Sequence, residues 1–265
     1  LEEGFGLARE AANRALEIDP RFAPAHAALA QVAMNFDGDL TAAAANLERA
    51  LELAPTNPDI LGTAASFAQN LGRVESAIPL KEYVLARDPV NVRDHYNLGI
   101  SYLLAGRYSE AIAPFQAALR LSPGLIGAHY FIGVAHLFSG DATSALEEFH
   151  EEPDDEYRVK GSALALFALG RLGEHEAALQ ELRDRWGGQW PSEVAQVYAW
   201  TGNPEQAFEW LERAVSQNED GVTQQFLWPY YASLHDDPRW SAFREQTGTS
   251  ERQLATIQFE VEVPR

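Results

Sequence analysis

The sequence of 265 residues contains no cysteine and few basic residues. Without cysteine the chain forms no disulfide bond, offers no thiolate to a metal ion and has no cysteine nucleophile. Lysines and arginines number 20 against 39 aspartates and glutamates, which gives a net charge of −19. Because Lys and Arg supply most of the affinity for phosphate backbones, this balance argues against nucleic acid and against anionic membranes as partners.

The sequence also lacks long apolar runs and catalytic motifs. No stretch reaches the ~18 apolar residues that a membrane span needs. A glycine-rich phosphate loop, a G-x-S-x-G elbow and an H-E-x-x-H motif are all missing,. We therefore predict a protein that is not an enzyme and needs no cofactor. We expect it in the cytoplasm, and a periplasmic location stays open as the alternative.

The sequence does contain an internal repeat of 34 residues, which glycine, alanine and proline mark. The glycines are Gly38, Gly72, Gly106 and Gly140, the alanines five positions later are Ala43, Ala77, Ala111 and Ala145, and the prolines are Pro55, Pro89 and Pro123. Two further pairs follow at shorter spacing, Gly173 with Ala178 and Gly202 with Ala207. A period near 34 residues with turn glycines predicts a solenoid of stacked helix pairs.

One repeat unit, residues 93–123, explains the period in physical terms. Apolar residues recur at helical spacing from Tyr96 to Leu104, and Gly106 ends that helix because it adopts the left-handed conformation at low cost,. A second apolar periodic run follows up to Pro123, which cannot continue a helix. Gly99 and Ala111 are small, so the two helices of the unit can approach closely beside Phe115.

The order His95-x2-Leu98-Gly99-x2-Tyr102, Ala111-x3-Phe115, Pro123 resembles the tetratricopeptide repeat pattern, with His95 in place of the usual tryptophan. The resemblance covers residues 4–218 and implies an all-α fold, a right-handed α-α superhelix. We predict a solenoid over residues 1–217, made of a half repeat and about six repeats, and capping helices with a short extended tail over residues 218–265. The half repeat at the start, with Ala8, Ala12 and Ala15, leads us to expect an excised fragment or a processed protein.

The resemblance also implies where a partner binds. Ligands of this family usually lie in the concave groove of the first helices, whose equivalents here are the predicted partner-binding residues Tyr96, Ile100, Leu103, Leu104, Tyr130, Val134, Leu137, Phe138 and Phe167. The equivalents in earlier units are polar, among them Gln31, Ser66 and Gln69. The Lys, Asn and Arg set of the family's carboxylate clamp is absent, so that function is not carried over. A bare apolar surface of this size is unusual, so we expect a partner or the chain itself to cover it, unless these residues only pack between repeats.

Two groups of residues invite a metal site and are interpreted otherwise. Seven acidic residues lie between Glu147 and Glu156. They lack the alternating ligands and turn glycine of a calcium loop, so we interpret them as a solvated loop between repeats. His26, His95 and His129 recur at one position of successive first helices, where we expect them to fill the slot of a large aromatic residue rather than bind zinc,. We predict no metal site.

The last 48 residues depart from the repeat. Trp228, Tyr230, Tyr231 and Leu234 are expected to cap the last helix pair, since a solenoid end otherwise exposes its core. Ile257, Phe259, Val261 and Val263 alternate with polar residues, a period of two that is typical of an extended segment with one apolar face,. We hypothesise that this tail folds back into the aromatic middle of the groove or pairs with the tail of a second copy, so a homodimer stays open.

Residues 198–214 and 234–240, and the closing residues 253–264, are similar to the ends of the tetratricopeptide halves that bacteria fuse behind class III adenylate cyclase, winged-helix or Ser/Thr kinase domains. This resemblance implies a sensing or assembly half of a signalling protein. We therefore predict a non-catalytic module that binds a peptide or partner protein in its concave groove. The alternatives are a structural or oligomerisation scaffold whose groove its own tail fills, and an enzyme or small-ligand binder, which needs a buried polar cluster facing the groove.

Overall fold

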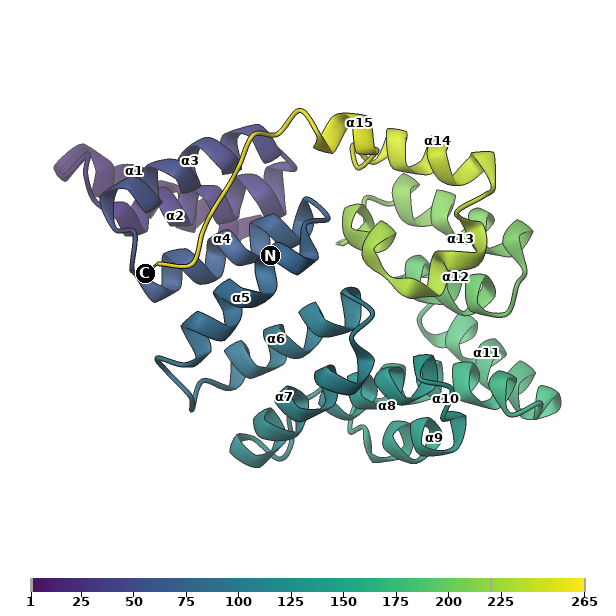
Figure 1. Ribbon diagram of the computed structural model, residues 1–265. Coiled ribbons are helices and arrows are strands. Elements are labelled where there is room, and N and C mark those ends of the chain that lie inside the picture. The colour runs from purple at the N-terminus through teal and green to yellow at the C-terminus, as the bar shows by residue number, and fades with distance from the viewer. Residues whose placement is uncertain (1, 220, 265) are drawn as a thin grey trace. The chain divides into compact units, whose positions relative to one another are not determined.

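The computed structural model describes residues 2–219 and 221–264, and helices are the only regular secondary structure in this part of the chain (Figure 1). The first elements are α1 (Glu2–Ile18), α2 (Ala23–Val32), the π-helical turn η1 (Ala33–Asp37), α3 (Leu40–Leu53), α4 (Pro58–Asn70) and α5 (Val74–Leu85). The middle elements are α6 (Val92–Leu104), α7 (Tyr108–Leu121), α8 (Ala128–Phe138), α9 (Ala142–Glu151), α10 (Asp155–Ala168) and α11 (Leu172–Arg185). The last are α12 (Pro191–Trp200), α13 (Pro204–Ser216), the 3-10 helices η2 (Val222–Leu227) and η3 (Pro229–Leu234), α14 (Pro238–Gln246) and α15 (Glu251–Leu254).

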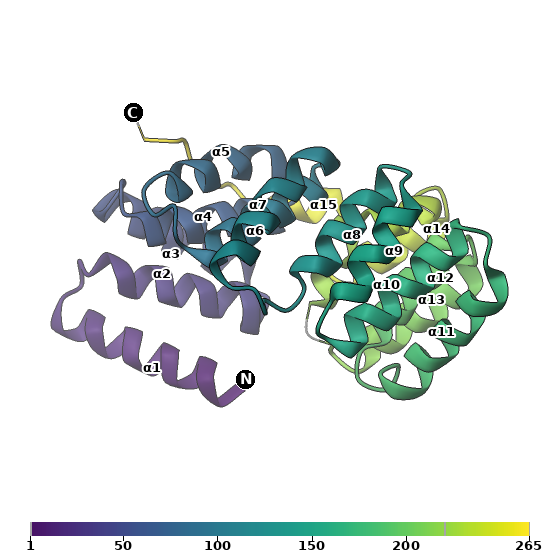
Figure 2. The same ribbon diagram turned by 90° about the horizontal axis from the view of Figure 1, so that it is seen from below.

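The helices pack in consecutive pairs that correspond to the predicted repeats. The pairs are α2 with α3, α4 with α5, α6 with α7, α8 with α9, α10 with α11, and α12 with α13, while α1 packs on α2 (Figure 2). Together with the structural relatives described below, this arrangement confirms the predicted all-α solenoid fold. None of the described helices combines the length and the apolar character that crossing a bilayer requires.

The turn inside most pairs has the predicted glycine in the left-handed conformation. Gly72 and Gly106 have φ values of +77° and +72° and directly follow the ends of α4 and α6. The prediction was wrong in the fifth full pair, where Gly170 (φ +71°) forms the turn and Gly173 lies inside α11. His175 therefore takes the position of the packing alanine, and its Nδ1 lies 2.8 Å from the carbonyl oxygen of Ala163.

Small residues on the first helices admit a phenylalanine from the second helix of the pair. A Cβ added to Gly99 would lie 2.6 Å from the Phe115 ring, and one added to Gly133 would lie 2.5 Å from the Phe149 ring. Real Cβ atoms do not approach so closely, so glycine lets each ring pack directly on the helix backbone. Phe115 and Phe149 are both completely buried.

The chain divides into two compact units, which are described separately. Unit 1 comprises residues 1–89 and 251–265, and unit 2 comprises residues 90–250. Unit 2 contains the helices from α6 to α14 and all nine predicted partner-binding residues. Unit 1 contains the helices from α1 to α5 and, from the other end of the sequence, α15 and the extended tail.

The tail lies on α4 and α5 of its own unit (Figure 1). Ile257 and Phe259 are buried and Val261 is partly buried, while Gln258, Glu260 and Glu262 are exposed, so the predicted apolar face of period two is confirmed for residues 257–261 and wrong for Val263, which is exposed. The hypothesis that this face enters the aromatic middle of the groove was wrong. Phe259 instead packs edge-on against Phe67 of α4, with ring centroids 4.9 Å apart. The tail lies there because α4 and α5 form an apolar cluster, against which Val261 of the tail packs.

Candidate functional site

The first helices of successive pairs lie side by side in unit 2, where α8 contacts both α6 and α10, and α10 contacts α12. Equivalent positions of successive repeats therefore form one continuous face. The nine predicted partner-binding residues all lie on α6, α8 and α10. Leu103, Tyr130, Val134 and Leu137 are at most 3% exposed, whereas Tyr96, Ile100, Leu104, Phe138 and Phe167 remain partly accessible.

Aromatic rings join the helices of this face. Tyr96 of α6 packs edge-on against Phe115 and Phe131, and those two rings stack on each other with centroids 5.7 Å apart. Tyr157 of α10 stacks on Tyr130 of α8 at 4.7 Å. Such contacts add to the free energy of burying the rings, so they hold the helices of the face together.

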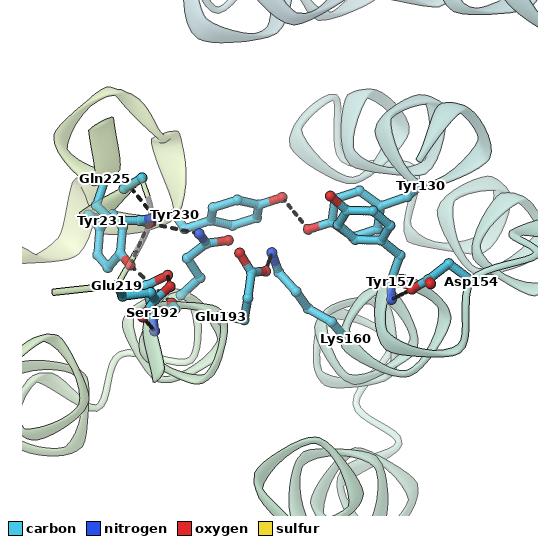
Figure 3. A network of polar contacts seen from close by, with 12 residues as sticks. Tyr130, Asp154, Tyr157, Lys160, Ser192, Glu193, Glu219, Gln225, Tyr230 and Tyr231 are labelled. Carbon is cyan, nitrogen blue, oxygen red and sulfur yellow. Dashed lines mark hydrogen bonds and ion pairs between the residues drawn. The ribbon is translucent and has the colours of Figure 1, made fainter. Parts of the chain in front are cut away.

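A segment from the C-terminal end of unit 2 covers part of this face. Trp228 stacks on Phe131 with ring centroids 5.6 Å apart and 9° between the planes. The neighbouring Tyr230 packs against Phe138, and its hydroxyl lies 2.8 Å from the hydroxyl of Tyr130 (Figure 3). The chain itself therefore covers part of this aromatic face of α6, α8 and α10. The covering residues are Trp228, the N-cap of η3, and Tyr230 within η3. From the sequence we expected these residues only to cap the last helix pair.

A buried ion pair lies directly beside the two tyrosines. The ammonium group of Lys160 on α10 pairs with the carboxylate of Glu193 on α12, and the Lys160 side chain is 3% exposed (Figure 3). The same nitrogen lies 5.0 Å from the Tyr130 ring centroid and 5.3 Å from that of Tyr230. An ammonium group above aromatic faces is attracted by their negative charge density, so Lys160 joins α8, α10, α12 and η3.

The acidity of the groups around Lys160 is altered by burial. Burial, and then unfavourable electrostatic interactions with Tyr230 and Glu193, raises the pKa of Tyr130 well above its usual value. Burial raises the pKa of Tyr230 as well, so both hydroxyls stay protonated at neutral pH and serve as hydrogen-bonding groups. Burial, followed by repulsion from Glu193, raises the pKa of Glu156 from 4.5 to about 7.

Two buried glutamates cap the helices of the face. Glu152 is 1% exposed, and its carboxylate accepts hydrogen bonds from the backbone N–H groups of Gly127 and Tyr130, at 2.9 and 3.1 Å. Glu219 accepts from the N–H of Ser192 at 2.9 Å and from its hydroxyl. A carboxylate at a helix N-terminus satisfies unpaired N–H groups and the positive end of the helix dipole. The interpretation of the acidic run as a solvated loop was therefore wrong: Glu152 is buried, and the run otherwise lies mostly in the end of α9 and the start of α10.

The predicted cap of the last helix pair is present. Tyr231 and Leu234 are completely buried, and η3 packs along α12. The Tyr231 hydroxyl lies 3.3 Å from the carbonyl oxygen of Ser192 and 3.1 Å from Oε1 of Gln225. The same amide oxygen accepts a 2.8 Å hydrogen bond from Gln196 of α12. These polar contacts fix the position of η3, and with it the position of Tyr230 (Figure 3).

The histidines do not converge on a common site. His129 forms a 2.8 Å contact with Glu148 of the paired helix, and His26 lies 3.2 Å from the carbonyl oxygen of Pro20. Within residues 2–219 and 221–264, no group of three or more His, Asp or Glu side chains is arranged to hold a metal ion. The titratable groups of the aromatic face described above are engaged in caps, an ion pair and tyrosine contacts, an arrangement suited to packing the helices together.

The comparisons with known proteins agree with this architecture. Residues 64–126 match the model of the tetratricopeptide repeat family. No curated protein matches the sequence. This match and the fold support tetratricopeptide repeats in the chain, whereas the similarity to cyclase, winged-helix and kinase fusions stays a prediction.

Solved structures with the same fold share little sequence identity with the chain. PilW, a widely conserved type IV pilus biogenesis factor, matches with a TM-score of 0.64 at 18% identity, over 74% of this chain and 91% of PilW. The anaphase-promoting complex hetero-tetramer Cut9–Hcn1 gives 0.61 at 15% identity, over 83% of this chain and 45% of the matched one. A human IFIT1 dimer with m7Gppp-AAAA gives 0.58 at 17% identity, over 95% and 66%. At this level of identity the likeness shows the fold.

Proposed function

We propose that this chain is a non-catalytic protein–protein interaction module that binds a peptide or a partner protein along the face formed by α6, α8 and α10. One observation carries the proposal: Ile100, Leu104 and Phe167 lie on first helices of this face and keep apolar surface accessible although their neighbours are buried. An apolar surface framed by a rigid scaffold is typical of a protein-binding site.

The structural relatives support the same class of function. PilW is a biogenesis factor for a pilus, and Cut9–Hcn1 is itself an assembly of proteins. The IFIT1 dimer is a complex with m7Gppp-AAAA, but the net charge of −19 of this chain argues against a similar ligand here,. The resemblance of residues 198–214 and 234–240 to bacterial fusion proteins supports a cytoplasmic role as the regulatory or assembly part of a larger signalling protein.

The proposal is tested with peptides selected against the purified chain from a random displayed library. Ile100→Glu and Leu104→Glu place charge on the accessible part of the face, and each should weaken binding of a selected peptide about tenfold or more, since a buried unpaired charge is strongly unfavourable. Ala113→Glu is the matched control, because Ala113 is exposed on the second helix α7. Equal affinity of all three variants and the wild type would place binding elsewhere and overturn the proposal.

A second candidate function is favoured by the contacts of Trp228 and Tyr230. Because these residues already occupy part of the face, the chain could instead be a structural scaffold that its own segment closes permanently. Trp228→Ala distinguishes the two. In a binding module the substitution opens additional apolar surface and strengthens binding of selected peptides, whereas in a permanently closed scaffold it lowers stability and leaves peptide binding unchanged.

A further inference from the structure

The extended tail of unit 1 is held in the way a protein holds a bound peptide. One guanidinium group, that of Arg73, donates hydrogen bonds to the backbone carbonyl oxygens of both Ile257 and Phe259. Carbonyl groups two residues apart point to the same side of an extended chain, so a single arginine can bind both. Backbone recognition of this kind depends on the extended conformation and hardly on side-chain identity.

Side-chain selectivity comes from the apolar face of the tail. Phe259 is 3% exposed and packs edge-on against Phe67, and Ile257 is 9% exposed. Val261 packs against a cluster between α4 and α5 that includes Leu61, Leu80 and Val84. The residues between them, Gln258 and Glu260, are exposed. The site therefore selects a segment with apolar residues at every second position.

The tail is separate in sequence from the surface that binds it. Unit 1 continues from residue 1 to residue 89 and resumes only at residue 251, after the whole of unit 2. The bound segment is therefore joined to its site in sequence only through residues 90–250, which form unit 2. When the tail leaves this site, an identical tail from another molecule can make the same contacts, and the exchange of an identical element between copies is a low-cost route to dimers.

We propose that the α4–α5 surface around Arg73 and Phe67 is a docking site for an extended segment with alternating apolar residues, and that its partner in trans is the tail of a second copy of this chain. Each of two molecules then places residues 257–261 on the other's α4–α5 surface. The choice of a second copy rests on complementarity, because this tail is the ligand whose fit to the site the structure shows. The proposal does not depend on the function proposed for unit 2, since site and ligand both belong to unit 1.

The experiment mixes two full-length variants with complementary defects. Arg73→Glu removes both hydrogen bonds to the tail but keeps the tail intact. Ile257→Asp/Phe259→Asp disrupts the tail but keeps the site. Arg73 lies in the turn before α5 and does not cap that helix with its side chain, so its replacement leaves the fold in place. Arg87→Glu, at an exposed position after α5, is the control.

The molar mass is measured by light scattering across a dilution series. The wild type and Arg87→Glu should form dimers as the concentration rises, and each defective variant alone should dimerise about tenfold or more weakly, because every tail-to-site contact in a homodimer is then impaired. The equimolar mixture should regain a dimer that contains one copy of each variant, since one intact tail meets one intact site. A wild type that stays monomeric, a mixture that stays monomeric, or defective variants that dimerise like the wild type would each overturn the proposal.

Discussion

The hydroxyl of Tyr130 lies 2.8 Å from the hydroxyl of Tyr230, 100 residues further along the chain. Both side chains are at most 2% exposed, so neither hydroxyl has water as a ready substitute partner. Removing one of them leaves the other without its hydrogen bond, while removing both leaves two apolar rings in contact. This pair connects the middle of unit 2 to its C-terminal segment.

The tyrosine pair should therefore show strong coupling. Tyr130→Phe and Tyr230→Phe should each lower the free energy of unfolding by about 1–2 kcal/mol, the usual cost of a buried polar group that loses its partner. The double variant should lose clearly less than the sum of the two. Urea unfolding of the four proteins measures this cycle, and additive effects would show that the contact contributes nothing.

The Lys160–Glu193 pair should be sensitive to loss of one partner. Lys160→Met leaves the largely buried Glu193 carboxylate without its partner and should cost about 2–4 kcal/mol, and a second substitution, Glu193→Gln, should recover a large part of that loss. Arg171→Ala is the control, because Arg171 and Glu174 form an exposed pair and such pairs contribute less than about 1 kcal/mol. Equal losses from Lys160→Met and Arg171→Ala in urea unfolding would contradict this account.

Glu152 caps the start of α8, and substitution of its neighbour Glu151 provides the matched control. Glu152→Ala removes the acceptor for two N–H groups at the start of α8 and should lower the free energy of unfolding by about 1–3 kcal/mol. Glu151 is exposed, and Glu151→Ala should stay within about 0.5 kcal/mol of the wild type. Thermal and urea unfolding of both variants test the prediction, which fails if the two substitutions have the same effect.

Glu156 should make stability depend on pH. Its pKa is about 7 in the folded chain and 4.5 in the unfolded one, so the folded state binds more protons between these values and loses stability as the pH rises through this window. Glu156→Gln removes the penalty. Because the side chain is only half-buried and water screens it, we expect a gain of about 1 kcal/mol at pH 8 and almost none below about pH 4.5. Urea unfolding at both pH values measures the difference, and an equal effect at both would contradict the raised pKa.

Two glycines on first helices should respond to alanine in opposite directions. In Gly133→Ala the new methyl group would lie 2.5 Å from the Phe149 ring, and the overpacking should cost about 1–3 kcal/mol. A methyl group added to Gly62 would meet no neighbouring side chain within 4 Å, so Gly62→Ala should stabilise α4 by about 0.5–1 kcal/mol through its helix propensity. A loss of stability in both variants would show that the close packing of Phe149 on Gly133 is not the cause of the loss in Gly133→Ala.

The repeat could be predicted from the sequence because its signals are local. Gly106 ends a helix by its own backbone conformation, and Gly99 and Phe115 belong to the same helix pair, so their spacing recurs with the period. The unit with Gly170 was misassigned because His175 replaces the packing alanine there, and the nearest glycine–alanine pair, Gly173 and Ala178, lies three residues later in the sequence.

The aromatic face could be predicted only in part. The repeat pattern predicted residues of α6, α8 and α10 for this face, but it carries no information on contacts between distant segments. The insertion of Tyr230 beside Tyr130 depends on the packing of η3 on α12, which no periodic pattern encodes. The burial of Glu152 among exposed acidic neighbours likewise depends on the N–H groups of another helix. The alternation of Ile257 and Phe259 predicted an apolar face of the tail but not the surface that receives it.

Hydrogen exchange of the chain with and without a selected peptide tests the proposed function most directly. If the face of the first helices is the binding site, bound peptide should slow exchange within residues 92–104 and 155–168, the segments of α6 and α10 that carry Ile100, Leu104 and Phe167. Exchange in the second helices α7 and α11 should stay unchanged. Protection confined to α7 and α11, with none in α6 and α10, would contradict the account.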